Sequence, residues 1–343
     1  MALAPKKKPT IWSMEKLTGF SRGTISRAFY SDSNINPATR EAILRKAAEI
    51  GYMPNSGVGA TMAGKIQRWG LLLPHLKNPW ICELTEAIDQ QARGRNVVLV
   101  TALSHYNATI EKKYLQLWMR GEMQGIIVAS MDIEDNYLTY LHAQSRFYPV
   151  VFIYPAPRES ADYVDVENYS SSKGAMQYLY DMGHRRIGFI SQYYPHVRAS
   201  TGFRAYCAFL GDHEIPILEE YIHIAPIERA AKSAWTAWKG MKHRPTAVLC
   251  SGDSLACALM MHVLGDGQRV PEDLSIIGHD NSEMAARMNI TTIGVDINVF
   301  AQEIVALLER PRGENRPKID HRMVPSSLIL RQSVAKINPE RRK

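Results

Sequence analysis

Two arginines in a short predicted helix near the N-terminus have the side-chain type that reads DNA bases. Arg22 and Arg27 fall on one side of this segment, opposite the apolar Ile25 and Phe29. A guanidinium group can donate two hydrogen bonds to O6 and N7 of guanine in the major groove. The face that we expect to meet DNA consists of Arg22, Gly23, Ser26 and Arg27. This pattern predicts base reading rather than an ordinary solvated helix face.

Positive charge is concentrated in the same part of the chain. The first 65 residues contain ten Lys or Arg and four acidic residues, whereas the remaining 278 contain 31 and 30. Phosphate neutralisation requires cations gathered on one small surface, so this asymmetry favours a nucleic-acid partner over a solvated basic tail.

A second set of polar residues follows short apolar runs in the rest of the chain. Asp253 and Asp280 each come directly after such a run, and a carboxylate binds hydroxyl donors strongly, as a sugar or polyol ligand would require. The indole of Trp80 could pack against the apolar face of a sugar ring. We expect the same ligand to contact four further residues, Asn78, Ser130, Tyr154 and Arg198. The alternative role of the two aspartates is capping, of a helix that begins at Ser254 and of a turn.

Two motifs suggest enzymes but lack their context. Residues 59–65 match GxxxxGK, yet Ile66 follows where a phosphate-binding loop needs Ser or Thr, and no strand precedes them. Residues 252–255 spell GDSL, as in a family of serine esterases, but they occur late and no DxxH follows. We therefore expect no enzyme, no cofactor and no metal; a GDSL-type hydrolase remains an alternative.

Residues 10–51 are predicted to form three short helices. The expected N-caps are Thr10, Ser21 and Asn36, the last followed by Pro37, and the expected terminators are Gly19 and Gly51. The expected buried residues are Met14, Leu17, Ile25, Phe29, Ile43, Ala47 and Ile50. Helix, glycine turn and helix form the helix-turn-helix pattern. Residues 53–68 have the composition of a linker.

From Trp69 onward, short apolar runs alternate with amphipathic helical stretches. The predicted strands are 70–73, 97–100, 125–129, 149–154, 187–191, 246–250 and 275–278. Predicted helices cover 80–94, with Ile81, Leu84 and Ile88 inward, and 171–182, with Ala175, Leu179 and Met182 inward. The alternation indicates parallel sheets with helices on both faces, and the length suggests two such units. Ligands bind at the carboxyl ends of such strands.

These segments together resemble the lactose-repressor/galactose-repressor (LacI/GalR) family. The matching stretches, in family order, are residues 10–29, 35–55, 70–80, 183–190, 245–248, 270–280 and 330–333. The resemblance implies an N-terminal all-α helix-turn-helix domain (1–52), a hinge (53–68) and an α/β periplasmic-binding-protein-like core of two parallel-sheet lobes. The implied N-lobe is 69–166 with 298–325, and the implied C-lobe is 167–297 with 326–338.

The resemblance also extends the set of expected DNA contacts. Ser21 and Thr24 would position the helix on phosphates, while Arg22 and Arg27 read bases. Further implied contacts are Thr10, Asn34, Tyr52, Asn55 and Met62. Hinge helices in this family wedge an apolar side chain into the minor groove. Met62 suits that role, and Thr61 is the competing assignment.

Several departures from the family pattern argue against a pocket for a common sugar. Gly252 replaces the usual Asn, Tyr154-Pro155 stands where Asp-Arg is common, and Val295 replaces a polar residue. Arg198 lies four residues before Gly202, whereas the family's ligand-contacting Arg usually lies three before it.

We therefore expect a sequence-specific transcription regulator, a repressor, that binds palindromic double-stranded operator DNA and a small carbohydrate-like effector. It would act as a cytoplasmic homodimer or tetramer without a membrane partner. The four cysteines, Cys82, Cys207, Cys250 and Cys257, have neither CxxC spacing nor histidine neighbours, which predicts reduced thiols. A soluble ligand-binding protein without DNA function is the alternative from another class.

Overall fold

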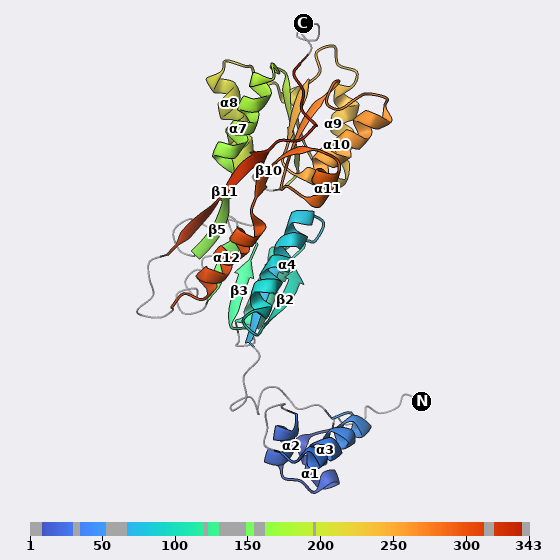
Figure 1. Cartoon of the computed structure of the whole chain (residues 1–343), viewed down its shortest axis with the longest axis vertical. Helices are drawn as coiled ribbons and strands as arrows, with labels where there is room; N and C mark the ends of the chain where they lie inside the picture. The colour runs from blue at the N-terminus through green and yellow to red at the C-terminus, as the bar shows by residue number, and fades with distance from the viewer. Residues whose placement is uncertain are drawn as a thin grey trace. The chain divides into compact units, whose positions relative to one another are not determined.

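The chain divides into two compact units, Met1–Ile66 and Gln67–Lys343. The computed structural model describes residues 9–29, 35–52, 67–119, 123–129, 149–153, 162–194, 197–311 and 319–337. None of the helices within these ranges has the length and apolar character needed to cross a membrane. The two units are described separately below (Figure 1).

Three helices form the first unit, as predicted. They are α1 (Ile11–Thr18), α2 (Arg22–Ala28) and α3 (Pro37–Ile50). Their shared core consists of Met14, Ile25, Ala28, Ile43, Ala47 and Tyr52, each at most 6% exposed. Leu17 was expected to be buried but is 54% exposed. With only eight residues, α1 buries a single position, Met14, against its neighbours.

The predicted caps fix where these helices begin and end. Thr10 accepts a hydrogen bond from the Ser13 backbone in a reciprocal capping box, and Ser21 accepts one from the Thr24 backbone. Asn36 caps α3, with Pro37 as its first residue. Gly19 and Gly51 end α1 and α3 at φ of 71° and 72°, a left-handed conformation that residues with a Cβ rarely adopt.

The second unit is built on a sheet whose strand order is β2-β1-β3-β4-β5-β11-β10-β9-β8-β6-β7. The strands are β1 (Gln67–Leu73), β2 (Val97–Leu103), β3 (Gly125–Val128), β4 (Val150–Ile153), β5 (Asp162–Glu167), β6 (Ile187–Gln192), β7 (Ile222–Ala225), β8 (Ala247–Cys250), β9 (Ser275–His279), β10 (Thr291–Val295) and β11 (His321–Ile329). Each half repeats one connectivity, because β2-β1-β3-β4-β5 is matched by β7-β6-β8-β9-β10. All neighbouring strands are parallel except β10 and β11.

Helices cover both faces of each half. They are α4 (Pro79–Arg93), α5 (Ala108–Trp118), α7 (Asn168–Asp181), α8 (Thr201–Asp212), α9 (Ile227–Trp238), α10 (Asp253–Gly265), α11 (Glu283–Arg287) and α12 (Ile297–Leu308), with 3-10 turns η1 (Val197–Ala199) and η2 (Glu219–Tyr221). We call β1–β5 with α4, α5 and α12 the N-lobe, and β6–β10 with α7–α11 the C-lobe.

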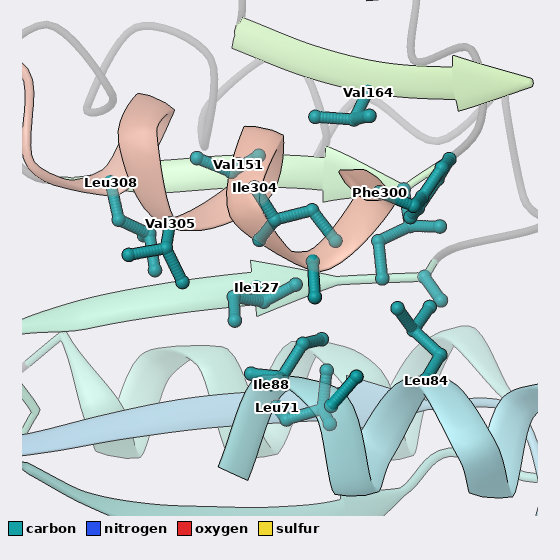
Figure 2. Close-up of a cluster of buried hydrophobic side chains, with 14 of the residues drawn as sticks. Leu71, Leu84, Ile88, Ile127, Val151, Val164, Phe300, Ile304, Val305 and Leu308 are labelled. Atoms are coloured by element: carbon teal, nitrogen blue, oxygen red, sulfur yellow. The ribbon is translucent and has the colours of Figure 1, made fainter. Parts of the chain in front are cut away.

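The N-lobe core depends on a helix from the far end of the chain. On one face of its sheet, α12 packs beside α4, and its Phe300, Ile304 and Leu308 point towards strand residues such as Ile127 (Figure 2). On the other face, α5 contributes the buried Trp118. The C-lobe is similar, with α9 and α10 on one face and α7 and α8 on the other.

Strand β11 joins the two lobes. Its residues His321–Pro325 pair in parallel with β5, and Ser326–Ile329 pair antiparallel with β10. The change of partner between Pro325 and Ser326 makes β11 a crossing from one lobe to the other, which Figure 1 shows as the long strand between them. Residues 167–168, between β5 and α7, and 296, between β10 and α12, are further crossings.

Seven strands were predicted, whereas the described residues contain eleven. The strands missed are β5, β7, β10 and β11. Their sequences, DYVDVE, IHIA, TTIGV and HRMVPSSLI, are short or mix polar with apolar residues. Strands β5, β10 and β11 lie beside the crossings, so they lack the continuous apolar run of a strand buried on both faces.

Candidate functional sites

The first candidate site is the exposed side of α2. Ile25 and Ala28 are fully buried, while Arg22, Gly23 and Arg27 on the other side are exposed. Thr24 and Ser26 are half-buried. The sequence-predicted face therefore exists as a surface, and it presents two guanidinium groups.

The guanidinium groups of Arg22 and Arg27 each contact neighbouring groups of the same helical unit. The Arg22 Cζ atom lies 3.9 Å from the centroid of the Trp12 ring, and its Nε lies 3.6 Å from Oε2 of Glu15. Arg27 Nε donates a hydrogen bond to the Gly23 carbonyl oxygen at 3.2 Å, one turn earlier in the same helix. The hydroxyl groups of Ser21 and Thr24 are hydrogen-bonded to each other at 2.9 Å.

The second candidate site is the edge at which the lobes face each other. Lys77, after β1, forms an ion pair of 2.7 Å with Glu228 at the start of α9 in the C-lobe. The Glu83 carboxylate on α4 lies near the backbone N–H of Glu283 on α11. Burial raises the pKa of Glu83, this N–H lowers it in part, and the nearby carboxylates of Asp280 and Glu283 raise it further. Side chains of the two lobes thus meet along this edge.

Asp253 braces the C-lobe side of this edge. Its side chain is 1% exposed; Oδ2 accepts a hydrogen bond of 2.6 Å from the Ser282 N–H, and Oδ1 accepts one of 2.6 Å from the Thr292 hydroxyl. Burial raises its pKa to about 6. A Cβ on Gly278 would lie 2.2 Å from Oδ1, so the glycine makes room for this carboxylate. Helix α10 begins at Asp253 itself, and its N-cap, Gly252, makes no side-chain cap.

Asp280 belongs to a polar chain that reaches the crossing. Its Oδ1 lies 3.1 Å from His279 Nδ1, and His279 Nε2 lies 2.9 Å from Oδ1 of Asn168, the first residue of α7. The backbone φ of Asp280 is 112°, a region that non-glycine residues rarely occupy. Such strain is a common property of ligand-binding loops.

A pocket of about 290 Å³ lies at the first turns of α7 and α8. Its lining includes Tyr169, Arg198, Phe203 and Arg204. Arg198 donates hydrogen bonds to both carboxylate oxygens of Glu219, at 3.0 and 2.8 Å. Arg204 is exposed and has no side-chain partner among the residues that the structure describes. It is the cation at this pocket that remains available to a ligand.

Known proteins resemble this chain over both of its units. Residues 176–334 match the model of a periplasmic binding protein-like domain. The HTH-type transcriptional repressor PurR of Photobacterium profundum is 23% identical over 333 residues, which cover 96% of this chain and 99% of the repressor. The chain therefore resembles HTH-type transcriptional regulators over nearly its whole length. The match to PurR includes both the helical unit and the two-lobed unit.

Solved structures confirm the predicted fold class. A LacI family protein from Silicibacter pomeroyi matches with a TM-score of 0.76 and 21% identity, covering 95% of this chain and 99% of that one. The transcriptional regulator CelR in complex with cellobiose matches with a TM-score of 0.67 and 22% identity, covering 95% and 100%. The fold of these two regulators thus covers both units of this chain.

Two predicted effector contacts have structural roles in this fold. Asn78 caps α4 by accepting a hydrogen bond from the Trp80 N–H at 3.0 Å. Trp80 is 4% exposed and packs edge-on against Phe300, with ring centroids 5.5 Å apart. The expectation that its indole face is open to a sugar is corrected, because Trp80 lies on the side of α4 that packs into the N-lobe core.

The remaining predicted residues divide into those placed and those not described. Tyr52 is 6% exposed and packs against Phe29, so little of its surface is available to DNA. Thr10 is exposed, with its hydroxyl engaged in the α1 cap. Asn34, Asn55, Met62, Ser130 and Tyr154 lie outside the described residues, as do Thr61 and most of the predicted hinge.

Sequence reasoning missed Trp12, Glu15 and Arg204. Trp12 and Glu15 are spaced i, i+3 on α1, but their contact with Arg22 crosses the turn between two helices, and spacing within one helix cannot reveal it. Arg204 lies in the first turn of α8, on the opposite side from the buried Tyr206. A cation opposite an apolar helix face is an ordinary surface pattern and gives no signal.

Proposed function

We propose that this protein is a sequence-specific DNA-binding transcription repressor, controlled by a small polar molecule bound between the lobes of its core. The observation that carries the proposal is the exposed face of α2, which presents Arg22 and Arg27 from a capped three-helix unit. The full-length similarity to a named repressor supports it, because that similarity includes the helical unit.

In this proposal Arg22 and Arg27 read base edges in the major groove, while Ser21 and Thr24 contact phosphates. Gly23 is exposed, and a Cβ there would meet no atom within 4 Å in the part of the chain that the structure describes, so the helix backbone can approach the DNA closely. Ser26 lies between the two arginines. The excess of positive charge in the first 65 residues supplies the sequence-independent part of the affinity.

One helical unit reads one half-site, so a palindromic operator requires two copies of the chain. We propose a homodimer formed through the two-lobed unit. Exposed apolar side chains support this role: Met261 and Leu264 on α10 and Met284 on α11 are 66%, 49% and 54% exposed. Size-exclusion chromatography with light scattering on the full chain measures the assembly; a monomer at micromolar concentration would contradict this part.

The effector site is proposed at the lobe edge near Asp280 and the Arg204 pocket. Both oxygens of Asp253 are occupied by protein donors, so Asp280 is the aspartate better placed to accept hydrogen bonds from a ligand. Carboxylate and guanidinium groups together suit a polyhydroxylated ligand. A sugar or sugar derivative is the proposed class, which the CelR–cellobiose complex supports by structural analogy.

The test is selection of duplexes from a random library by the full-length protein, followed by thermal-shift screening of sugars and sugar acids. We expect one palindromic motif, and a ligand that changes operator affinity about 5- to 150-fold. In Arg27→Ala, the preference at one base pair per half-site should fall by about 1–3 kcal/mol. Enrichment of no motif, with ligand binding intact, would instead favour a ligand-binding protein without DNA function.

A further inference from the structure

Trp12 is a large aromatic side chain left in solvent. It is 59% exposed, on a helix whose interior position is occupied by Met14. Its ring faces the Arg22 guanidinium, with Cζ 3.9 Å from the ring centroid. At this distance the positive charge interacts favourably with the electron-rich ring face, and planar guanidinium stacks well on indole. The ring therefore restricts the orientation of the Arg22 side chain.

Glu15 restricts the same group from another direction. Its Oε2 lies 3.6 Å from the Arg22 Nε, and the two side chains are 38% and 50% exposed. Pairing at Nε leaves the terminal nitrogens of Arg22, which form the fork that binds guanine O6 and N7. The aromatic ring and the carboxylate together hold the guanidinium while its reading end remains open.

We propose that Trp12 and Glu15 are positioning residues that set the base preference of Arg22. The inference rests on the proposed DNA-reading function and adds to it two specificity determinants on the first helix. An arginine held in one orientation loses less side-chain entropy when it binds a base and tolerates fewer alternative bases. Arg27 is held instead by its own helix, through the Gly23 carbonyl, and therefore does not depend on Trp12.

The experiment measures binding of the full-length protein to its selected operator and to all single-base-pair variants of one half-site. The variants are Trp12→Ala, Trp12→Phe, Glu15→Gln, Arg22→Ala and the double variant Trp12→Ala/Arg22→Ala, with Leu17→Ala as the control. Leu17 is an exposed residue of the same helix, at 54%. Thermal unfolding checks that each variant is folded.

We expect Trp12→Ala to reduce the preference about three- to tenfold at the base pair that Arg22→Ala also affects. The preference at the Arg27 base pair should stay unchanged, and Trp12→Phe should retain part of the effect. In the double variant the loss should equal that of Arg22→Ala alone, because Trp12 acts through Arg22. Glu15→Gln should give a smaller loss at the same base pair, and Leu17→Ala none.

Three outcomes would overturn the inference. A uniform loss of affinity that adds to that of Arg22→Ala would mean that Trp12 contacts DNA itself. An unchanged or increased preference in Trp12→Ala would mean that the ring does not position Arg22 for reading. Wild-type protein without any base preference would remove the proposed function as well, whereas selective wild type with unaltered variants would remove only the positioning role.

Discussion

At the scale of single residues, the two aspartates predicted to bind a ligand have different environments. Asp280 is linked to His279 at the lobe edge, whereas Asp253 is enclosed and accepts hydrogen bonds from Ser282 and Thr292, with no cation in contact among the residues that the structure describes. A buried carboxylate without a counter-charge is costly in its ionised form. This cost makes stability depend on pH.

The folded-state pKa of Asp253, about 6, lies above the ordinary 3.8. Its contribution to stability is therefore fully present below about pH 4 and is lost as pH rises through about 6, an effect of about 3 kcal/mol at most. We expect Asp253→Asn to remove this pH dependence of the free energy of unfolding. Its amide has no charge to lose, and it can accept a hydrogen bond from the Ser282 N–H and donate one to the Thr292 hydroxyl oxygen. Urea unfolding from pH 4 to 7.5 measures it, with the exposed Asp181→Asn as control. If the free energy of unfolding changed equally with pH in wild type and in Asp253→Asn, Asp253 would not be the source of this pH dependence.

Gly23 gives a second prediction at this scale. It lies at an exposed position of α2, and a Cβ added there would meet no atom of the described residues within 4 Å, so Gly23→Ala should stabilise the helical unit by about 0.5–1 kcal/mol. If the helix backbone approaches DNA there, operator affinity should fall despite the gain. Thermal unfolding and operator titration of the same variant measure the two effects. A gain in both would mean that DNA does not come close to Gly23.

At the scale of elements, the brace at Asp253 holds β9 against the first turn of α10. A Cβ on Gly278 would lie 2.2 Å from Asp253 Oδ1 and 3.3 Å from the Ala256 Cβ. The sequence pattern indicated Asp253 as a ligand contact and did not reveal its contact with Gly278, because this constraint arises only when the strand and the helix pack together. The energetic coupling between Gly278 and Asp253 can be measured with single and double variants.

We expect Gly278→Ala alone to destabilise the two-lobed unit by about 1–3 kcal/mol through overpacking. Asp253→Ala alone should cost a similar amount, because the Ser282 N–H and the Thr292 hydroxyl lose their acceptor. In the double variant the new methyl group has the space that the carboxylate leaves, so the combined loss should be smaller than the sum. Denaturant unfolding of the four proteins decides this, and strict additivity would show that the two sites are independent.

Caps and apolar periodicity made the first unit largely predictable. Thr10, Ser21, Asn36, Gly19 and Gly51 act locally, so their residue types already determine helix ends. The core strands with continuous apolar runs were predictable for the same reason. Strand β11 was not, because its polar sequence reflects a crossing between lobes, and Trp80 was misassigned because position at a strand end does not determine which way a helix turns its side chain.

At the scale of the whole two-lobed unit, an ion pair between the lobes can affect the balance between open and closed arrangements. Nζ of Lys77 lies 2.7 Å from Oε1 of Glu228, although the two residues are 151 positions apart in the sequence. An effector can alter such a contact only by binding one arrangement of the lobes better than the other. Reversal of the charges tests the contact directly.

Lys77→Glu should separate the lobes by repulsion from Glu228 and increase the radius of gyration of the full chain measured by small-angle X-ray scattering at low salt. Lys77→Glu/Glu228→Lys should restore the wild-type value, and about 1 M salt should remove the difference. The matched control reverses Lys173, whose 2.6 Å pair with Asp212 lies within the C-lobe. A radius unchanged in Lys77→Glu would show that this pair does not hold the lobes together.

The return of α12 to the N-lobe also determines the order in which a chain leaving the ribosome can fold. Domains usually fold in the order of their synthesis. Here a nascent chain that ends at Asp296 contains β1–β5 and α4 but lacks Phe300, Ile304 and Leu308, which cover one face of the sheet together with α4. The same chain already contains β6–β10 and α7–α11. The lobe made second therefore completes its core first. The lobe made first keeps part of an apolar sheet face uncovered until translation is nearly complete, and during that time it most needs protection by chaperones.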